Sequence, residues 1–374
     1  REALVVELCP AEVFQNETAR VIRKYKGNIG NTVDSILKDV LKTTNYKTNN
    51  IEQTKNNYTF YGNIKRPFTV LTWLCPKSIP AKTESSEKAG TAGFLFYQNK
   101  DGFNFKSVDS LMSGFELNTS NKRTILKYVY KARTDNAADP NSNFKILSVP
   151  VFEKNVNIME NLRIGMYSSR SYFFDVNDRK FYEYKYTLKE SYKLMGTASK
   201  ANVTPPVPLG LDESPSRLMV RVLDNFNADP ALESDAKTAA INISKDDTSL
   251  YQAASLARYN LAFSQRLNIT IPLNLNLTVG DVIELDFGVI TKSDSEKGTK
   301  DRQKSGYYLI KELSHLFEQN QGYTGLKLIR DSYGEPPEWQ TLMITFKKIE
   351  KIGRAHVWTP VTPISRMPSS AWKK

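Results

Sequence analysis

The sequence predicts an α+β fold rich in β-structure, with an antiparallel barrel-like domain beside a mixed α/β domain that carries short helices. Amphipathic helical spacing near the N-terminus, aromatic hairpin patterns in the middle and four closely spaced strand patterns near 266–330 predict this class. With 374 residues, of which 40% are hydrophobic, the chain can bury one large core or several smaller ones.

Two short helices are predicted in the first part of the chain. The clearest follows Asn31 or Thr32, either of which can cap its N-terminus. Its apolar residues recur on one helical face: Val33, Ile36, Leu37, Val40 and Leu41. A second helix should begin at Pro67, which suits a first turn, and stop before Pro76. Each helix should pack its apolar face on a core.

Strand patterns come next, and two of them form hairpins. The segment Ala3–Leu8 reads as a strand inside a longer protein. The first hairpin turns at 99–102 within 94–106, and the second turns at Asn177–Asp178 within 172–186. The second arm of the second hairpin alternates aromatic and charged residues, as a half-exposed strand should.

The C-terminal half combines a linker, a helix and a strand cluster. Thr204–Gly210 is the best linker candidate, and Asp247 can cap a helix from Thr248 to about Phe263. Four alternating strands then follow, at 266–273, 282–287, 307–316 and 326–329. Their short spacing indicates a small antiparallel barrel or sandwich.

Residue types that carry chemistry are sparse. Cys9 and Cys75 lack metal-binding spacing, so two reduced, buried thiols are expected, with a disulfide as the alternative. His315 lies in a predicted strand without a neighbouring nucleophile, and we expect it to be a hydrogen-bonded structural group. No GxSxG, HExxH or GxxxxGK[ST] motif occurs. The sequence therefore predicts no enzyme, and no catalytic, cofactor-binding or metal-binding residue.

Two chemical alternatives remain open at this point. The acid pairs Asp246–Asp247 and Asp175 with Glu183 would suit a cell-wall glycosidase if two carboxylates converged, but spacing alone does not show this. The segment Tyr182–Tyr186 interleaves aromatic and charged residues and could stack bases, although its strand period favours an ordinary sheet face. The excess of positive charge could also line a channel for nucleic acid.

The final stretch, Ile352–Lys374, resembles a translated sequencing-library adapter in which a stop codon is read as Trp358. A disordered basic tail is the alternative reading of its Pro, Ser and Lys content. The stretch holds four basic residues and no acidic one, so the formal net charge of +12 falls to +8 without it. Removing it weakens the argument for nucleic-acid binding.

Two clusters of motifs resemble the baseplate hub family of contractile-tailed, T-even-like bacteriophages. The first cluster comprises Asn16–Arg20, Thr32–Leu41, Arg66–Pro76, Ala92–Tyr97 and Asp101–Leu111. The second comprises Leu277–Leu285, Ser305–Ile310, Ser314–His315 and Leu328–Asp331, and it is also similar to barrels of type VI secretion spikes. Each motif alone is a turn with a strand or helix, and their order carries the resemblance.

The resemblance implies a structural virion protein of the tail baseplate, assembled in the cytoplasm of the bacterial host. Family members form a homotrimer whose chains each carry two similar barrels, which adapts a threefold spike to the sixfold tail tube. The implied partners are the spike or tail lysozyme protein, tail tube or tube-initiator proteins, and DNA that passes transiently through the lumen. The alternative is a spike or hub component of a type VI secretion-like contractile injection system.

The resemblance also divides the chain into expected parts, and no membrane span is expected. The parts are the last strand of a truncated first tube barrel (1–11), a middle α+β domain (12–149), a second tube-like barrel with a helical insertion near 191–263 (150–334), a C-terminal extension (335–351) and the adapter-derived tail (352–374). The aromatic hairpin around Asn177–Asp178 is expected to join the strands of 267–330 in the second barrel. A fragment without most of the first barrel is expected to have difficulty closing a ring.

Overall fold

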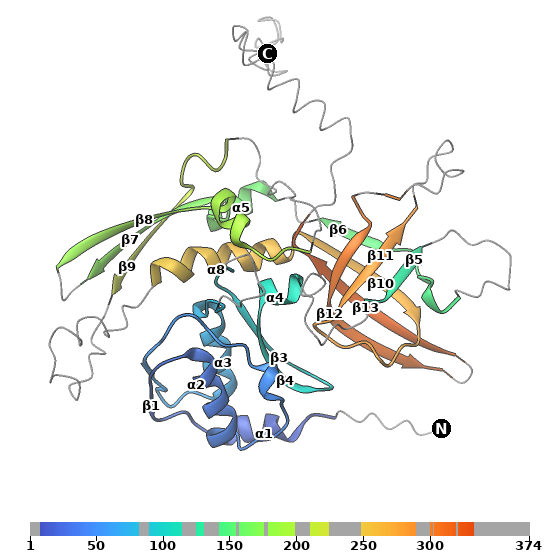
Figure 1. The fold of residues 1–374 in the computed structure, drawn as a ribbon, viewed down its shortest axis with the longest axis horizontal. Helices are drawn as coiled ribbons and strands as arrows, with labels where there is room; N and C mark the ends of the chain where they lie inside the picture. The colour runs from blue at the N-terminus through green and yellow to red at the C-terminus, as the bar shows by residue number, and fades with distance from the viewer. Residues whose placement is uncertain are drawn as a thin grey trace, which may run out of the picture. The chain divides into compact units, whose positions relative to one another are not determined.

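A six-stranded sheet, a three-stranded sheet and a lobe of short helices with two two-stranded sheets are described in the computed structural model, which has the predicted α+β class (Figure 1). It describes residues 8–81, 90–113, 125–130, 142–154, 157–175, 179–198, 210–223, 248–288, 300–301, 303–318 and 321–332. The predicted first strand, the linker at 204–209 and everything from 333 onward, including the extension and the tail, lie outside these residues.

The first lobe, residues 8–113, packs short helices around a β-hairpin. Its elements are α1 (Ala11–Thr18), β1 (Lys24–Tyr25), α2 (Ile29–Ser35), a π-helical turn (Ile36–Val40), β2 (Phe60–Tyr61), α3 (Pro67–Leu74), β3 (Phe94–Asn99), β4 (Gly102–Ser107), α4 (Val108–Met112), and 3₁₀ turns at Thr48–Asn50 and Cys75–Lys77. The two predicted helices and the first predicted hairpin are confirmed. Their apolar faces meet in one core, where Phe94 stacks on Phe105 with ring centroids 4.8 Å apart.

The N-cap of helix α2 lies three residues before Asn31, the first of the two predicted caps, so this prediction was wrong. Asn28 is the N-cap, because its side chain accepts a hydrogen bond from the Gly30 amide at 2.9 Å. The Asn28 carboxamide also bonds to Thr54, so a residue distant in sequence holds the cap in place. Local spacing alone could not reveal this contact.

The half-barrel sheet has six strands in the order β5-β11-β12-β13-β10-β6. Their bounds are β5 (Lys127–Tyr130), β6 (Val151–Lys154), β10 (Gln265–Pro272), β11 (Val282–Phe287), β12 (Gly306–Phe317) and β13 (Gly322–Arg330), with a 3₁₀ turn at Ser142–Phe144. The four predicted strands are therefore confirmed. The four predicted strands pair antiparallel with one another, as expected of the barrel-like domain. The added strand β5 runs parallel to β11. Among the described residues β5 and β6 do not pair with each other, although Val129 of β5 bridges Lys145, which precedes β6.

The aromatic hairpin belongs to a separate three-stranded sheet, which corrects its expected place in the barrel. This sheet has the order β8-β7-β9, with β7 (Ser168–Asp175), β8 (Lys180–Thr187) and β9 (Arg217–Leu223). Strand β9 runs parallel to β7. Helices α5 (Ile158–Ile164), α6 (Leu188–Ser191) and α8 (Thr248–Ala262) and a 3₁₀ turn (Tyr192–Leu194) accompany it. The hairpin itself was predicted from alternation, which does not specify the neighbouring strand.

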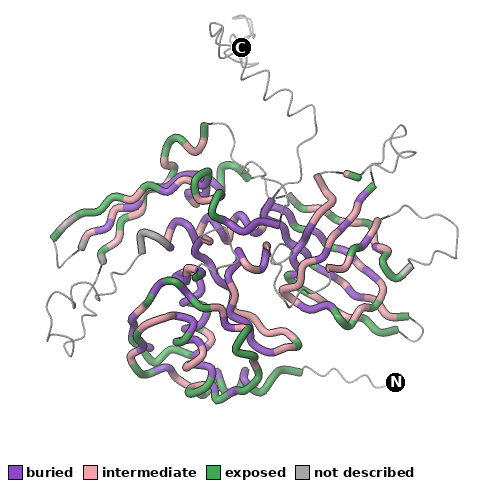
Figure 2. The backbone as a smooth tube through the Cα atoms, viewed as in Figure 1, coloured by how far each residue is buried: buried purple, intermediate pink, exposed green. Residues whose placement is uncertain are grey.

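Helix α8 connects the two sheets through different parts of its surface (Figure 2). Its N-terminal part, including Tyr251 and Ala254, packs in a core with Tyr186 of the three-stranded sheet. Its C-terminal part, around Ala262, packs in another core with Leu309 of the half-barrel sheet. The predicted helix is confirmed, and it serves as a bridge between the two sheets.

Gly102 begins β4 where the backbone leaves no room for a side chain. Its φ is +103°, and a Cβ there would collide with the carbonyl of Asn45. Gly27 has a similar φ of +105° but open space around it.

We expect Gly102→Ala to lower the free energy of unfolding by about 2 kcal/mol or more, because it adds a steric clash to the backbone strain. Gly27→Ala introduces the strain alone and should cost about 1 kcal/mol. Urea denaturation of both variants measures the difference. Equal losses would show that the close approach to Asn45 costs nothing.

Candidate functional site: a buried ion-pair junction

An arginine with no exposed side-chain surface lies where the first lobe, helix α8 and the half-barrel sheet meet. Arg258 belongs to α8, and its side chain is 0% exposed. It lies four residues after Ala254, so it shares the buried face of the helix. A buried guanidinium is costly unless charged and hydrogen-bonded partners surround it.

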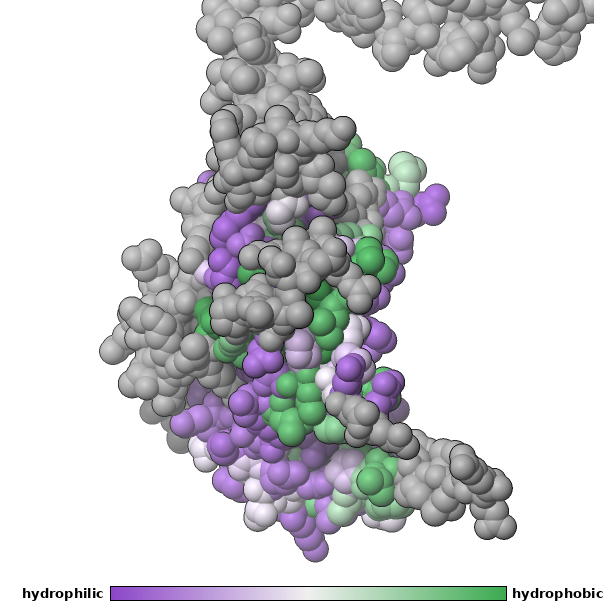
Figure 3. Space-filling model, turned by 90° about the vertical axis from the view of Figure 1, so that its right-hand side faces the viewer, coloured by the Kyte–Doolittle hydropathy of each residue, from purple (hydrophilic) through white to green (hydrophobic). Residues whose placement is uncertain are grey.

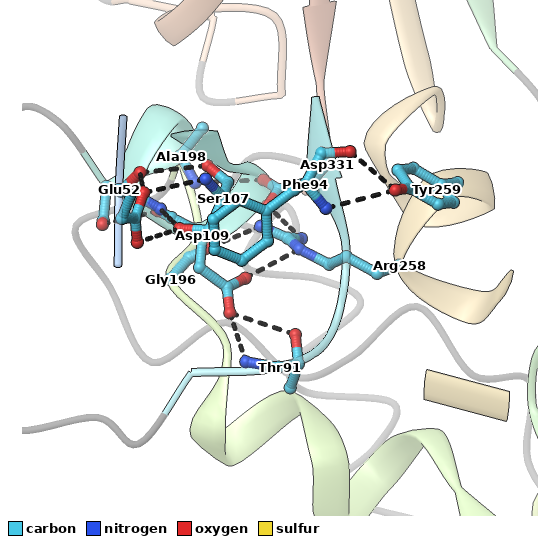
Figure 4. A network of polar contacts seen from close by, with 12 residues as sticks. Glu52, Thr91, Phe94, Ser107, Asp109, Gly196, Ala198, Arg258, Tyr259 and Asp331 are labelled. Atoms are coloured by element: carbon cyan, nitrogen blue, oxygen red, sulfur yellow. Dashed lines mark hydrogen bonds and ion pairs between the residues drawn. The ribbon is translucent and has the colours of Figure 1, made fainter. Parts of the chain in front are cut away.

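Two carboxylates and one carbonyl supply those partners (Figure 4). Arg258 Nε lies 2.8 Å from Asp109 Oδ1, and Nη1 lies 2.9 Å from Asp331 Oδ2. Nη2 donates to the carbonyl oxygen of Gly196 at 2.6 Å. Asp109 belongs to α4, and Asp331 follows β13 directly. One side chain therefore connects four separate segments of the chain.

Backbone donors hold both carboxylates in place. Asp331 Oδ1 accepts a hydrogen bond from the Ala198 amide at 3.0 Å. Asp109 Oδ2 accepts hydrogen bonds from the amide and the hydroxyl of Thr91, the latter at 3.0 Å. Each acid thus uses one oxygen for the guanidinium and the other for neighbouring protein groups. This arrangement fixes the rotamers of all three charged residues.

The junction holds two carboxylic acids and one arginine, and burial shifts the pKa values of Asp109 and Arg258. Burial raises the pKa of Asp109, while the Arg258 charge opposes that shift. Burial alone would lower the pKa of Arg258, but Asp109 and Asp331 raise it, so the guanidinium remains protonated. Burial also raises the pKa of Tyr192 nearby, and its phenol stays neutral. The two buried carboxylates therefore need the positive charge of Arg258 to remain ionised without destabilising the fold.

A third carboxylate, that of Glu52, fixes the orientation of the helix that carries Asp109. Glu52 accepts three hydrogen bonds of 2.8 Å at the start of α4, from the Ser107 amide, the Ser107 hydroxyl and the Ser110 hydroxyl (Figure 4). Burial raises the pKa of Glu52, and these hydrogen bonds oppose the rise. The acid acts as a cap supplied from a distant segment.

Two further contacts attach α8 to the first lobe. The Tyr259 hydroxyl donates to the Phe94 carbonyl at 2.6 Å and accepts from the Phe94 amide at 3.1 Å. The Lys77 ammonium lies 4.5 Å from the ring centroid of Trp73 and 5.2 Å from that of Tyr251 on α8. Such cation–π contacts stabilise by about 1–2 kcal/mol when desolvated. The bridge helix is therefore attached at several points.

The geometry of the junction suits a mechanical role. All three charged side chains are buried and contact one another or neighbouring protein groups. We interpret the cluster as a rigid clamp between parts of the fold.

The residues considered from sequence do not converge on a reactive site. His315 Nδ1 lies 3.0 Å from the Thr324 hydroxyl, which confirms a hydrogen-bonded histidine in a strand. Glu183 lies opposite Tyr172, and Asp175 lies opposite Lys180. Asp175 and Glu183 are therefore not opposite each other in the β7–β8 hairpin. Asp246 and Asp247 lie outside the described residues.

Two further expectations concerned the burial of both cysteines and the sheet face formed by Tyr182–Tyr186. Both cysteines are free, but Cys9 is exposed, which corrects the expectation that both thiols are buried. Glu183 pairs with Arg170 at 3.0 Å, while Tyr186 on the opposite face is buried. The Tyr182–Tyr186 segment is therefore an ordinary sheet strand.

Metal sites and membrane-spanning helices are both absent from the described residues. No group of three or more His, Cys, Asp or Glu side chains there has the arrangement of a metal site. No helix among them combines the length and apolar character needed to cross a bilayer.

Sequence reasoning missed the junction, although one signal for it exists. An arginine four residues after Ala254, within a predicted apolar stripe, is unusual and indicates a buried partner. Nothing in the sequence around Asp109 or Asp331 distinguishes them from surface acids. Their pairing requires the tertiary fold.

Comparisons with known proteins return distant structural likenesses. No family model matches the chain, and neither does any curated protein. Solved structures that resemble it include a tail protein from Neisseria meningitidis (TM-score 0.41, 12% identity, 86% of this chain and 73% of that one) and the 43 kDa tail protein of prophage MuSo2 from Shewanella oneidensis (TM-score 0.38, 9% identity, 87% and 72%). The phage P2 baseplate also matches (TM-score 0.20, 11% identity, 66% and 50%). Likenesses at these TM-scores are too distant to assign this chain a function.

Removing the guanidinium should destabilise the fold strongly. We expect Arg258→Met to lower the free energy of unfolding by about 3–5 kcal/mol, because two buried carboxylates lose their cation. Adding Asp109→Asn and Asp331→Asn to Arg258→Met should recover part of the loss. Arg23→Met, which breaks an exposed pair with Asp39, should cost less than about 1 kcal/mol. Chemical denaturation tests all of these variants, and similar losses for Arg258→Met and Arg23→Met would contradict the clamp.

The buried Glu52 carboxyl should make the free energy of unfolding depend on pH. Because its folded pKa is raised, the unfolded chain loses this proton first as pH rises above about 4. The free energy of unfolding of the wild type should therefore fall relative to Glu52→Gln between that pH and the folded pKa, by about 1.4 kcal/mol for each unit that the pKa is raised.

Glu312 provides a control of opposite sign. Its hydrogen bonds with Lys311 and Lys327 lower its pKa to about 2. The wild type should therefore lose stability relative to Glu312→Gln as pH falls below the ordinary range of a glutamate. Denaturation curves at several pH values measure both trends. A difference in the free energy of unfolding between wild type and Glu52→Gln that does not change with pH would contradict the prediction for Glu52.

Proposed function

We propose that this chain is a structural component of a phage tail baseplate, a trimeric hub that adapts a threefold cell-puncturing spike to the sixfold tail tube. The proposal rests on the two clusters of motifs that resemble the baseplate hub family. It assigns the chain no catalytic step, because its prominent buried polar cluster is a sealed clamp.

The observation that carries the proposal is the meeting of the two motif clusters at one guanidinium. Asp109 belongs to the first cluster, 101–111, and Asp331 belongs to the second, 328–331. Both carboxylates bind Arg258, at 2.8 and 2.9 Å. The segments that carry the resemblance therefore form one connected framework, although they are far apart in the sequence.

The open edges of the sheets support an assembly role. Among the described residues, β6, β8 and β9 each pair with a neighbouring strand on one side only. Natural proteins cover or protect such edges, and assembly is one way to cover them. A hub ring would use some of these edges between subunits.

The partners in this proposal follow from the same role. They are two further copies of the chain, the spike or tail lysozyme protein, and tail tube or tube-initiator proteins in the virion. DNA would pass through the lumen with transient, non-specific contacts between phosphates and basic side chains. The formal net charge of +8 without residues 352–374 suits such contacts.

Mass measurement of a co-purified complex tests the proposal. The chain is co-expressed with the spike and tube proteins encoded by the same phage, and the complex is analysed by light scattering and native mass spectrometry. We expect three copies of the chain for each spike trimer. A monomer that binds neither the spike nor the tube protein would refute the hub function.

A further inference from the structure

A turn in the first lobe holds a β-branched residue in the left-handed region of backbone conformation. Asn63 and Ile64 have φ values of +48° and +56°. The Lys65 amide donates a hydrogen bond to the Gly62 carbonyl at 3.0 Å and closes the turn around them. Glycine and asparagine adopt this region readily, whereas a β-branched side chain does so only with strain. Asn63 therefore suits its position, and Ile64 does not.

Burial does not offset the strain at Ile64 within the described part of the chain. Ile64 is 68% exposed, although its amide donates to the Val21 carbonyl at 3.1 Å and holds the turn against the segment that leads into β1. An exposed isoleucine gains little from the hydrophobic effect. Backbone strain of this kind is found where a fold holds a residue in the orientation that a ligand or partner requires.

Two further apolar side chains are exposed on the same pair of segments. Ile22 is 71% exposed, and Tyr61 of β2 is 60% exposed, whereas Val21 and Phe60 belong to the core of the lobe. We call Ile22, Tyr61 and Ile64 the β1–β2 patch. Figure 1 shows β1 on the side of the first lobe away from the half-barrel sheet. The surface of this lobe that is seen in the lower part of Figure 3 is mainly hydrophilic, with hydrophobic residues scattered over it.

Positive charge accompanies the β1–β2 patch. The cations on the same two segments are Arg20, Arg23, Lys24, Lys26, Lys65 and Arg66. The Lys24 ammonium lies 5.7 Å from the ring centroid of Tyr61, so a cation stands directly beside the patch. Asp39 and Glu17 each pair with one of the arginines, at 2.9 Å. Six cations and two paired acids give this surface a net positive charge.

We propose that the β1–β2 patch binds an acidic protein segment that carries exposed aliphatic side chains. Carboxylates of that segment would face the lysine and arginine side chains, and its aliphatic groups would cover Ile22, Tyr61 and Ile64. The phosphate backbone of a nucleic acid would match the charge but would leave both isoleucines exposed. The combination of charge and aliphatic surface therefore favours a protein partner. The patch lies in the first lobe and uses none of the sheet edges of the proposed hub ring.

Fluorescence anisotropy with synthetic probes tests the site on the full chain. The probe is a fluorescein-labelled peptide of alternating glutamate and leucine, and the comparison probes are a glutamate-only peptide and a single-stranded DNA of similar charge. We expect saturable binding of the glutamate–leucine peptide that is about tenfold tighter than binding of either comparison probe, a difference of about 1.4 kcal/mol. Equal or tighter binding of the DNA or of the glutamate-only peptide would overturn the proposal, and so would a lack of saturable binding.

Ile64→Asn separates a binding role from a structural one. Asparagine tolerates the left-handed region, so this variant should unfold at a higher urea concentration than the wild type. The variant also lacks the exposed aliphatic group, so it should bind the glutamate–leucine peptide about tenfold more weakly. Leu316, which is 56% exposed on β12, provides the control, because Leu316→Asn should leave peptide binding unchanged. Unchanged binding by Ile64→Asn, or an equal loss with Leu316→Asn, would contradict the proposed site.

Charge reversal tests the other half of the recognition. Lys24→Glu and Lys65→Glu should each weaken binding of the glutamate–leucine peptide. Salt at about 1 M, where the Debye length is about 3 Å, should weaken binding by the wild type. Lys189→Glu on α6 changes the net charge of the chain equally and should have no comparable effect. Equal losses with all three variants would show attraction to the whole basic chain and would refute a specific patch.

Discussion

The structure depends on one buried guanidinium that two carboxylates share. Arg258 has no exposed side-chain surface, and its burial is tolerable only while Asp109 and Asp331 both reach it. These acids come from α4 and from the end of β13, so the pairing forms only when the first lobe, α8 and the half-barrel sheet have docked. An alternative docking would leave a charge buried without a partner. The ion pairs thus select one arrangement of the parts, whatever their net contribution to stability.

This constraint gives the chain the properties of an assembly component. Helix α8 connects two sheets, and the contacts of Tyr259, Lys77 and Arg258 hold it against its surroundings. Meanwhile both sheets keep free edges among the described residues, with exposed aliphatic stripes on β9 and beside β6. A stiff body with two distinct binding edges can transmit a defined rotation from one copy to the next. The proposed hub ring requires such a body.

Much of the local structure could be predicted because local periodicity reflects burial. Helix α3 spans the residues between Pro67 and Leu74 as predicted, since proline at both ends defines its limits. The β3–β4 hairpin follows from aromatic segments around an Asn–Gly turn region. The start of α2 was misplaced because its cap, Asn28, is held by Thr54. The aromatic hairpin was assigned to the wrong sheet because alternation defines a strand without specifying its neighbour.

The sequence by itself determined the α+β class, the main helices and strands and the structural role of His315. These depend on spacing within short segments, which the side chains of each segment impose locally. Only the tertiary structure decided that β5 pairs parallel with β11, that β7 and β8 join β9, and that Arg258 binds both acids. Strand pairing and buried ion pairs join residues distant in sequence. The free energy of such contacts depends on the desolvation of both partners together, and no local pattern records it.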